Sequence, residues 1–112
     1  MSDVQILDID EGVSRVVNNR NLYGKLLLRF AETMGDAPDK IAALMAQNSC
    51  EEAVRLAHTV KGSAANLSAH ALAEAAREVE VALRQSEPME ERLQNMRGVL
   101  DTTLAEMAEF KA

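Results

Sequence analysis

Apolar residues recur at every third or fourth position along most of the chain, which is the spacing of an amphipathic helix rather than of a strand. Near the beginning, this spacing predicts a short helix through the valines of 13–17, with Asp8 or Asp10 as its cap. The polar run 18–21 then interrupts the pattern. We expect the short helix to lie across the other helices as a lid.

A series of further helices is predicted by the same spacing, and each begins at a recognisable N-terminal signal. The connections between them are short, so neighbouring long helices should run antiparallel. The sequence therefore predicts an all-α fold, an antiparallel up-down four-helix bundle with a short extra N-terminal helix. The signals are Asn19 or Asn21 before the stripe that runs from Leu22 to Gly35, Asp36-Ala37-Pro38-Asp39, the capping box Ser49-Cys50-Glu51-Glu52, Ser68, and Ser86-Glu87-Pro88.

The chain has 112 residues, which is enough for one core and too few for two, so we expect a single domain over 1–112. Its composition, 47% hydrophobic but only 3% aromatic, suits helices that pack through small and flexible side chains. Lysine and arginine number 12 against 18 acidic residues, which leaves a formal charge of -6. Such an acidic balance disfavours nucleic acid as a partner.

Cys50 is the only cysteine, so the chain can form neither an internal disulfide nor a thiolate cluster for a metal. A lone cysteine fits a reducing compartment. The first residues lack the basic and apolar regions of a signal peptide, and no apolar run approaches the length that spans a membrane. We expect a cytoplasmic protein without direct membrane contact, either free-standing or part of a longer chain.

The stretch 57–67 carries the candidate chemistry. Read as a helix at about 100° per residue, it places Leu56, Val60 and Leu67 roughly opposite His58. The imidazole therefore faces away from the core, where its neutral form offers a nucleophilic nitrogen. Such a nitrogen can accept a phosphoryl group, a reaction that depends on in-line positioning and on nearby positive charge.

Lys61 and Gly62 share the face of His58, because residues three or four positions apart are neighbours on a helix. Lys61 can supply positive charge to a phosphoryl group. Glycine inside a helix costs about 1 kcal/mol relative to alanine, so Gly62 indicates a need for close approach by a partner.

Arg55, Ser63 and Asn66 are auxiliary candidates on the same helix. Arg55 lies one turn before His58 and could add a second cation, although a solvated surface role is favoured for it. Ser63 and Asn66 are either hydrogen-bonding neighbours of the histidine or ordinary helix surface.

The run Ala57-His58-Thr59-Val60-Lys61-Gly62-Ser63-Ala64-Ala65-Asn66-Leu67 resembles the signature of histidine-containing phosphotransfer (HPt) domains, in which His, Lys and Gly stand at this spacing before a Leu. The resemblance extends upstream to Ile9 and downstream to Glu80, so it covers nearly the whole chain. Two positions depart from it, because Ser68 stands where many members have glycine and Val60 where leucine is common. Neither departure affects the acceptor.

The resemblance implies an intermediate of a phosphorelay in two-component signal transduction. His58 would be the phosphoacceptor, taking a phosphoryl group on Nε2 from the aspartyl phosphate of a receiver domain and passing it reversibly to another receiver. Lys61 would stabilise the phosphate charge, and Gly62 would give access. The partners would be response-regulator receiver domains and a hybrid sensor histidine kinase. The chain would be a monomer without kinase activity, ATP site, cofactor or metal of its own, and the divalent metal would belong to the receiver.

Three other interpretations compete with this one. A sensor-kinase dimerisation domain also displays a phosphorylated histidine on a bundle, but its acceptor is generally followed by an acidic residue, and here Thr59 follows. A carboxylate-bridged metal bundle would need Glu three residues before an inward-facing His, and Arg55 and Leu67 occupy those places. A binding module that only blocks a kinase or receiver would be expected to lose His58 or its companions.

Overall fold

The computed structural model describes residues 6–112, in which every regular element is an α-helix. The all-α prediction is confirmed for this part of the chain. The helices are α1 (Ile9–Arg15), α2 (Arg20–Met34), α3 (Ala37–Ala46), α4 (Cys50–Asn66), α5 (His70–Arg84) and α6 (Glu90–Glu109).

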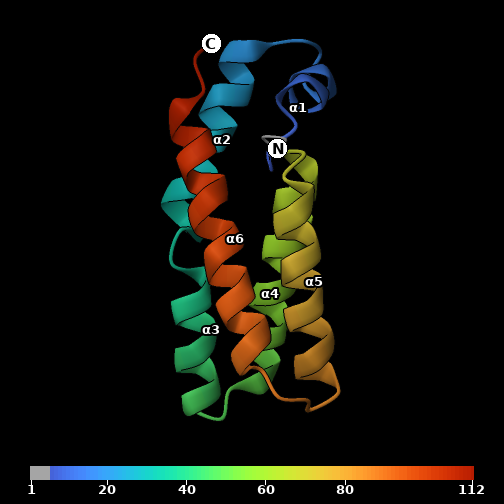
Figure 1. The fold of residues 1–112 in the computed structure, drawn as a ribbon, viewed down its shortest axis with the longest axis vertical. Coiled ribbons are helices and arrows are strands. Elements are labelled where there is room, and N and C mark those ends of the chain that lie inside the picture. Colours follow the sequence, from blue (N-terminus) through green and yellow to red (C-terminus); the bar gives the residue numbers. More distant parts are fainter. Residues whose placement is uncertain (1–5) are drawn as a thin grey trace, which may run out of the picture.

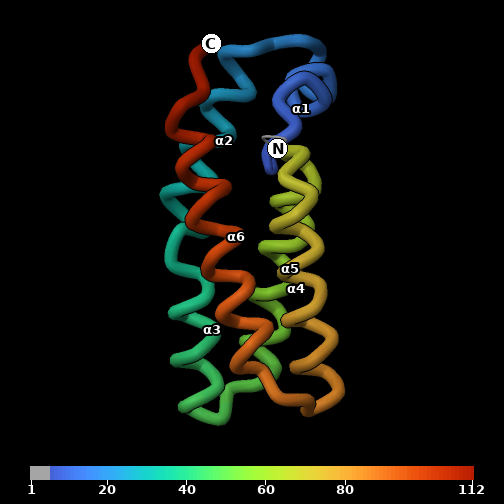
Figure 2. Tube along the Cα trace, in the orientation of Figure 1, coloured from blue at the N-terminus to red at the C-terminus, as the bar shows by residue number. Residues whose placement is uncertain are grey.

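The helices α2 and α3 follow one another along the same side of the molecule, and α6 runs back beside both of them (Figure 1). The pair α4 and α5 shares the most extensive helix contact, and the chain reverses between them (Figure 2). Our expectation that neighbouring helices are antiparallel is wrong for α2 and α3. The reason is local, because Gly35 keeps helical backbone angles of φ -63° and ψ -21°, so the chain continues in the direction of α2.

Small side chains are buried on both α4 and α5, the two helices that share the most extensive contact. Ala57 and Ala64 of α4 are buried, as are Ala75 and Ala76 of α5. The distance between two packed helices depends on the side chains at their contact, so alanines allow the two backbones to approach closely. Polar side chains at the edge of this contact can therefore reach across from one helix to the other.

Side-chain caps confirm two of the predicted helix starts. The carboxylate of Asp8 and the side-chain oxygen of Asn19 each accept a hydrogen bond from the backbone N–H three residues further on. Asp36 and Ser49 occupy the N-cap positions of α3 and α4, but neither side chain bonds to the helix backbone. The capping box predicted at Ser49 is therefore not formed.

Ser68 and Ser86 do not cap the helices that follow them, contrary to our prediction. Their φ angles are 62° and 55°, and α5 and α6 have Ala69 and Met89 as their N-caps. The backbone N–H of each serine bonds back to a carbonyl in the last turn of the preceding helix. A residue with positive φ commonly ends a helix, and glycine is favoured there. Both serines therefore terminate helices rather than begin them.

Replacing Ser68 by Gly should raise the free energy of unfolding by about 1 kcal/mol, because glycine adopts a positive φ without steric cost. The Ser68 hydroxyl is buried and forms no hydrogen bond to a described residue, so its removal breaks no hydrogen bond and adds to the expected gain. Urea unfolding measures the change, and the exposed variant Ser86→Gly reports the backbone effect alone. A loss of stability in Ser68→Gly beside a gain in Ser86→Gly would show that side-chain packing outweighs the strain.

The short helix α1 covers one end of the molecule (Figure 1). Gly12 of this helix lies against the ring of Tyr23. Gly12 allows this approach, because a Cβ there would clash with the ring. The Tyr23 hydroxyl donates a hydrogen bond of 2.7 Å to the Leu67 carbonyl, and burial raises the pKa of Tyr23 to about 12. Tyr23 thereby joins α1 to the end of α4.

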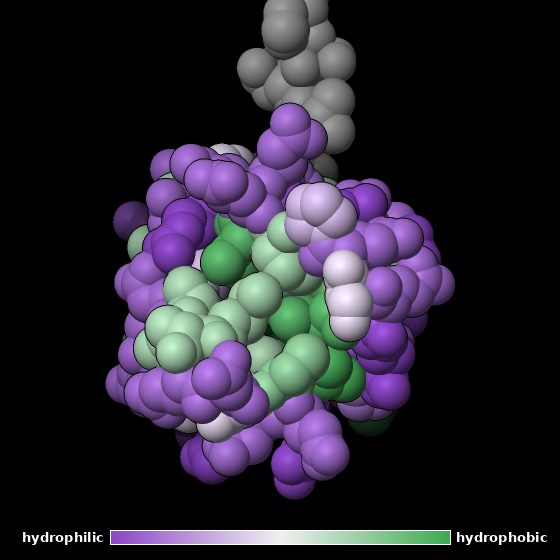
Figure 3. All heavy atoms as spheres, turned by 90° about the horizontal axis from the view of Figure 1, so that it is seen from below, coloured by the Kyte–Doolittle hydropathy of each residue, from purple (hydrophilic) through white to green (hydrophobic). Residues whose placement is uncertain are grey.

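The opposite end of the molecule, where α3 is joined to α4 and α5 to α6, shows apolar residues surrounded by polar ones (Figure 3). Elsewhere the large apolar side chains of Val17 (90%), Leu28 (62%) and Leu22 (41%) are exposed. Among residues 6–112, no helix combines the length and the apolarity that crossing a membrane requires.

Candidate functional site

His58 lies in the middle of α4, and 60% of its side chain is exposed. Its Nδ1 faces α5, where it lies 3.1 Å from Oε2 and 3.3 Å from Oε1 of Glu80. No residue of 6–112 forms a hydrogen bond with its Nε2. The imidazole is held at one nitrogen and open at the other.

The carboxylate of Glu80 selects which ring nitrogen of His58 carries the proton. An ionised carboxylate only accepts hydrogen bonds, so the neutral ring bonds to it by donating the proton at Nδ1. The lone pair of the neutral ring is then at Nε2. The site presents an exposed nucleophilic nitrogen in a fixed tautomer.

Glu80 is the centre of a polar cluster, with only 7% of its side chain exposed. Its Oε1 lies 3.2 Å from Nζ of Lys61, and its Oε2 lies 2.8 Å from Nη2 and 3.1 Å from Nε of Arg84. We refer to His58, Lys61, Glu80 and Arg84 as the Glu80 cluster. Its members come from α4 and α5, so the cluster depends on the close packing of these helices.

Burial would raise the pKa of Glu80, but hydrogen bonds from Arg84, Lys61 and His58 together outweigh it and lower the pKa from 4.5 to about 2. Glu80 is therefore ionised at neutral pH. Its negatively charged carboxylate binds both cations and the imidazole, and so holds them together in one site.

The free energy of unfolding should fall as the pH is lowered through the range from 4.5 to about 2, in part because of Glu80. The pKa of Glu80 is lower in the folded chain than in the unfolded one, so the folded state binds fewer protons in this range and loses its advantage as the pH falls. The Glu80 contribution lost between pH 7 and pH 3 is on the order of 2 kcal/mol.

Urea unfolding at these two pH values checks the Glu80 prediction. The variant Glu80→Gln should lose less stability than the wild type on going to pH 3. Glu78→Gln, which changes an exposed glutamate of the same helix, should behave as the wild type. Equal losses in the wild type and in Glu80→Gln would contradict the role assigned to this carboxylate.

Glu80 and Arg84 are site residues that helical periodicity alone does not predict. A signal for them exists, because Glu80 falls on the buried stripe of α5 next to Val79, where an unpaired carboxylate would be costly. Arg84 follows four residues later, at the spacing of a helical ion pair. This combination indicates a buried ion pair, whereas the contact with His58 depends on how α4 and α5 pack.

Gly62 lies one turn after His58 on the exposed face of α4. Apart from the adjoining backbone of α4 and the two chain neighbours, no described atom lies within 4 Å of the position that a Cβ on Gly62 would occupy, so no neighbouring helix requires a glycine there. Glycine is also unfavourable inside a helix by about 1 kcal/mol relative to alanine. The space beside the imidazole is therefore open to another molecule.

Residues 25–110 match the family model of the Hpt domain. The chain belongs to the Hpt domain family. Hpt domains carry phosphoryl groups on a histidine in two-component phosphorelays, interact with receiver domains of response regulators, and generally lack kinase activity. Comparisons with curated proteins and with solved structures gave no match. The match to the family covers α3 to α6 in full, including the Glu80 cluster.

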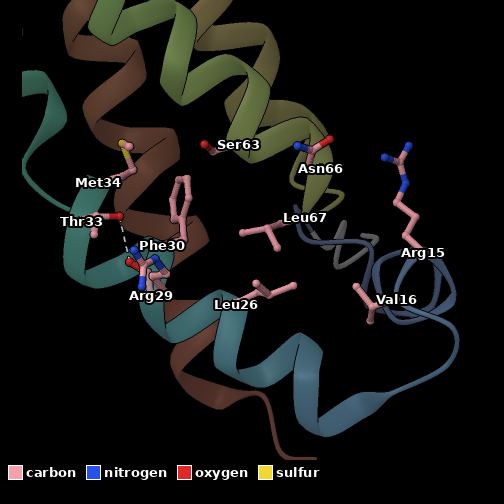
Figure 4. A pocket seen from close by; sticks show the side chains of 10 residues that line it. All are labelled: Arg15, Val16, Leu26, Arg29, Phe30, Thr33, Met34, Ser63, Asn66 and Leu67. Carbon is pink, nitrogen blue, oxygen red and sulfur yellow. Dashed lines mark hydrogen bonds between the residues drawn. The ribbon is translucent and has the colours of Figure 1, made fainter.

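This Hpt domain has a groove of about 740 Å³ between α2, the last turns of α4 and the end of α1 (Figure 4). Arg15 and Arg29 lie toward opposite sides of the groove. On the α4 side it begins at Ser63, the residue after Gly62, so it adjoins the face that carries the glycine. Its apolar lining consists of Val16, Leu26, Phe30, Met34 and Leu67.

The auxiliary residues do not join the Glu80 cluster of the Hpt domain. Ser63 and Asn66 line the groove instead. The side chain of Arg55 is exposed and forms no ion pair with a residue of 6–112. Of the residues that the sequence singles out, the structure brings together His58 and Lys61, through Glu80.

His70 of the Hpt domain lies apart from the Glu80 cluster, at the beginning of α5. Its Nε2 is 2.5 Å from Oε1 of Glu11, so this pair connects α5 to α1. In the part of the chain that the structure describes, no group of three or more His, Cys, Asp and Glu side chains is arranged to hold a metal ion.

Proposed function

We propose that His58 is the phosphoacceptor of this Hpt domain, taking a phosphoryl group from the aspartyl phosphate of one receiver and passing it to the aspartate of another. The observation that supports this most is the state of the imidazole, with Nδ1 bound to Glu80 and the exposed ring open at Nε2. A phosphoryl acceptor needs a nitrogen lone pair that an in-line donor can reach.

The transfer step does not require a proton to leave the site. The Nε2 lone pair attacks phosphorus, the N–P bond forms as the P–O bond to the aspartyl oxygen breaks, and the aspartate leaves as a carboxylate. The ring keeps its Nδ1 proton and becomes a cation, which the Glu80 carboxylate stabilises from 3.1 Å. The same steps in reverse deliver the phosphoryl group to the next receiver.

Lys61 and Gly62 support the transfer in different ways. The ammonium of Lys61 is bound to Glu80, and 33% of its side chain is exposed, so it can turn toward a phosphoryl group on Nε2. Phosphoryl transfer gains from positive charge near the equatorial oxygens. Gly62 leaves the space beside the ring free for the receiver.

The groove beside Gly62 is part of the surface that we assign to the receiver. Its apolar lining offers area to bury, and Val17, which follows Val16 of that lining in the chain, is itself 90% exposed. Arg15 and Arg29 add positive charge beside an otherwise acidic molecule. Within the groove these two side chains, of which Arg15 also lies 3.9 Å from Glu11, favour contact with an anionic group of the receiver.

The remaining features of the proposal concern the whole chain. Residues 1–112 form one Hpt domain, in which α2 and α3 together make one member of an antiparallel four-helix bundle and α1 is the extra helix. The domain acts as a monomer, between receivers and a hybrid sensor kinase. It needs neither an ATP site nor a metal, because the receiver supplies the phosphoryl group and carries the divalent cation.

Transfer from a phosphorylated receiver tests the proposal. The chain is mixed with a purified receiver that carries a radioactive aspartyl phosphate, in the presence of Mg²⁺, and the label on each protein is followed. We expect label on the chain that is stable in alkali and labile in acid, as expected for phosphohistidine, and its loss when a second receiver is added. Acid-stable label, or no label from any receiver of the organism, would overturn the proposal.

A further inference from the structure

Arg84 reaches the site only through Glu80. Its guanidinium places Nη2 at 2.8 Å and Nε at 3.1 Å from the same carboxylate oxygen. An exposed ion pair at this helical spacing is usually weak, because water screens both partners. Here the arginine side chain is 59% exposed but the glutamate side chain only 7%, so one end of the pair is shielded from water.

The Glu80 cluster contains more positive than negative charge before any phosphoryl group arrives. Lys61 and Arg84 are two cations around one carboxylate. Lys61 holds Oε1 through a single nitrogen, whereas Arg84 holds Oε2 through two. A phosphoryl group on His58 would add nearly two negative charges beside the cluster. The cation with fewer bonds to Glu80 is the one that can move toward it.

We propose that Arg84 is a positioning residue, which keeps Glu80 paired so that the carboxylate holds Nδ1 of His58 while Lys61 is released to the phosphoryl group. This inference rests on the proposed function of His58. Without Arg84, Lys61 would be the only cation bound to the buried carboxylate of Glu80. If Lys61 then moved to the phosphoryl group, Glu80 would be left unpaired beside a group of like charge. Glu80 would then retain Lys61.

Phosphohistidine lifetimes test this inference without any receiver. Phosphoramidate, a small phosphoryl donor, is used to load His58 directly, and the decay of the phosphohistidine is followed by ³¹P NMR. Lys61→Ala and Arg84→Ala should each shorten the lifetime by about tenfold, since each removes the same lysine contact from the phosphoryl group. The double variant should decay no faster than Lys61→Ala, because the two changes act on one interaction. Arg84→Lys should restore most of the lifetime.

The matched control is Arg77→Ala, which removes the arginine of an exposed ion pair with Glu74 on the same helix and should leave the lifetime unchanged. A wild-type lifetime in Arg84→Ala, or a double variant whose loss is the product of the two single losses, would overturn the inference. Failure of receivers to load His58 when phosphoramidate does so would instead overturn the proposed function, and the lifetimes would still decide the role of Arg84.

Discussion

Replacing His58 by Gln should leave the Hpt domain folded but unable to accept a phosphoryl group from a receiver. The imidazole is exposed at the surface of α4, so the substitution disturbs no core contact. The glutamine amide can still donate a hydrogen bond toward Glu80, but it has no nucleophilic nitrogen. We expect acid-labile label to fall at least about a hundredfold, to background, because removing a nucleophile abolishes the covalent step.

The second histidine provides the control for this substitution. His70 is also exposed, at 54% of its side chain, and bonds to a glutamate, but it lies on α5 next to α1. His70→Gln should accept label as the wild type does, and circular dichroism should show the same helix content in all three proteins. Undiminished label on His58→Gln would show that another residue is the acceptor, and loss of label in both variants would point to a shared structural fault.

The helical segments and the outward direction of His58 can be predicted from the sequence because both depend on local periodicity. The position of a side chain around a helix follows from its spacing to neighbouring apolar residues. Val60 lies on the buried side of α4, Leu67 at its C-cap is also buried, and His58 lies on the exposed side, as the spacing alone predicts. The same holds for Gly62, whose place relative to the imidazole is set by the turn of the helix.

What the sequence could not predict depends on packing between helices or on the backbone angles of single residues. The contact of His58 with Glu80 requires α4 and α5 at a particular distance and rotation, which no stripe on one helix defines. Ser68 shows the second case, because a serine between two helices can cap the next or end the last, and its positive φ decides for the latter. Gly35 is another residue whose backbone angles decide the fold, since its helical φ and ψ keep α2 and α3 pointing the same way.

The packing of small residues connects the fold to the chemistry. Helices α4 and α5, both of which bury alanines, pack closely enough for Glu80 to bind His58 from the neighbouring helix. The same contact buries Glu80, which would be costly without Lys61 and Arg84. The fold thus places one buried carboxylate so that it fixes the tautomer of an exposed ring, while the ring remains open on its other side.

Replacing Gly62 by Gln should slow transfer from a phosphorylated receiver by about tenfold or more, because the new side chain would occupy the approach to the imidazole. The open space around Gly62 means that the change meets no neighbour within the domain. The free energy of unfolding should rise by up to about 1 kcal/mol, since glutamine is a better helix former than glycine. Stopped-flow or quench-flow transfer assays and urea unfolding measure the two effects on the same samples.

Gly98→Gln separates the effect of access from the effect of helix stability. Gly98 lies on α6, outside the Glu80 cluster, and a Cβ there would also meet no atom within 4 Å. This variant should gain the same stability and keep the wild-type transfer rate. Phosphoramidate is small enough to reach His58 past a glutamine, so Gly62→Gln should be loaded by it nearly as fast as the wild type. Slow loading by both donors would mean that the substitution alters the imidazole itself, and wild-type transfer from the receiver would show that Gly62 has no role in access.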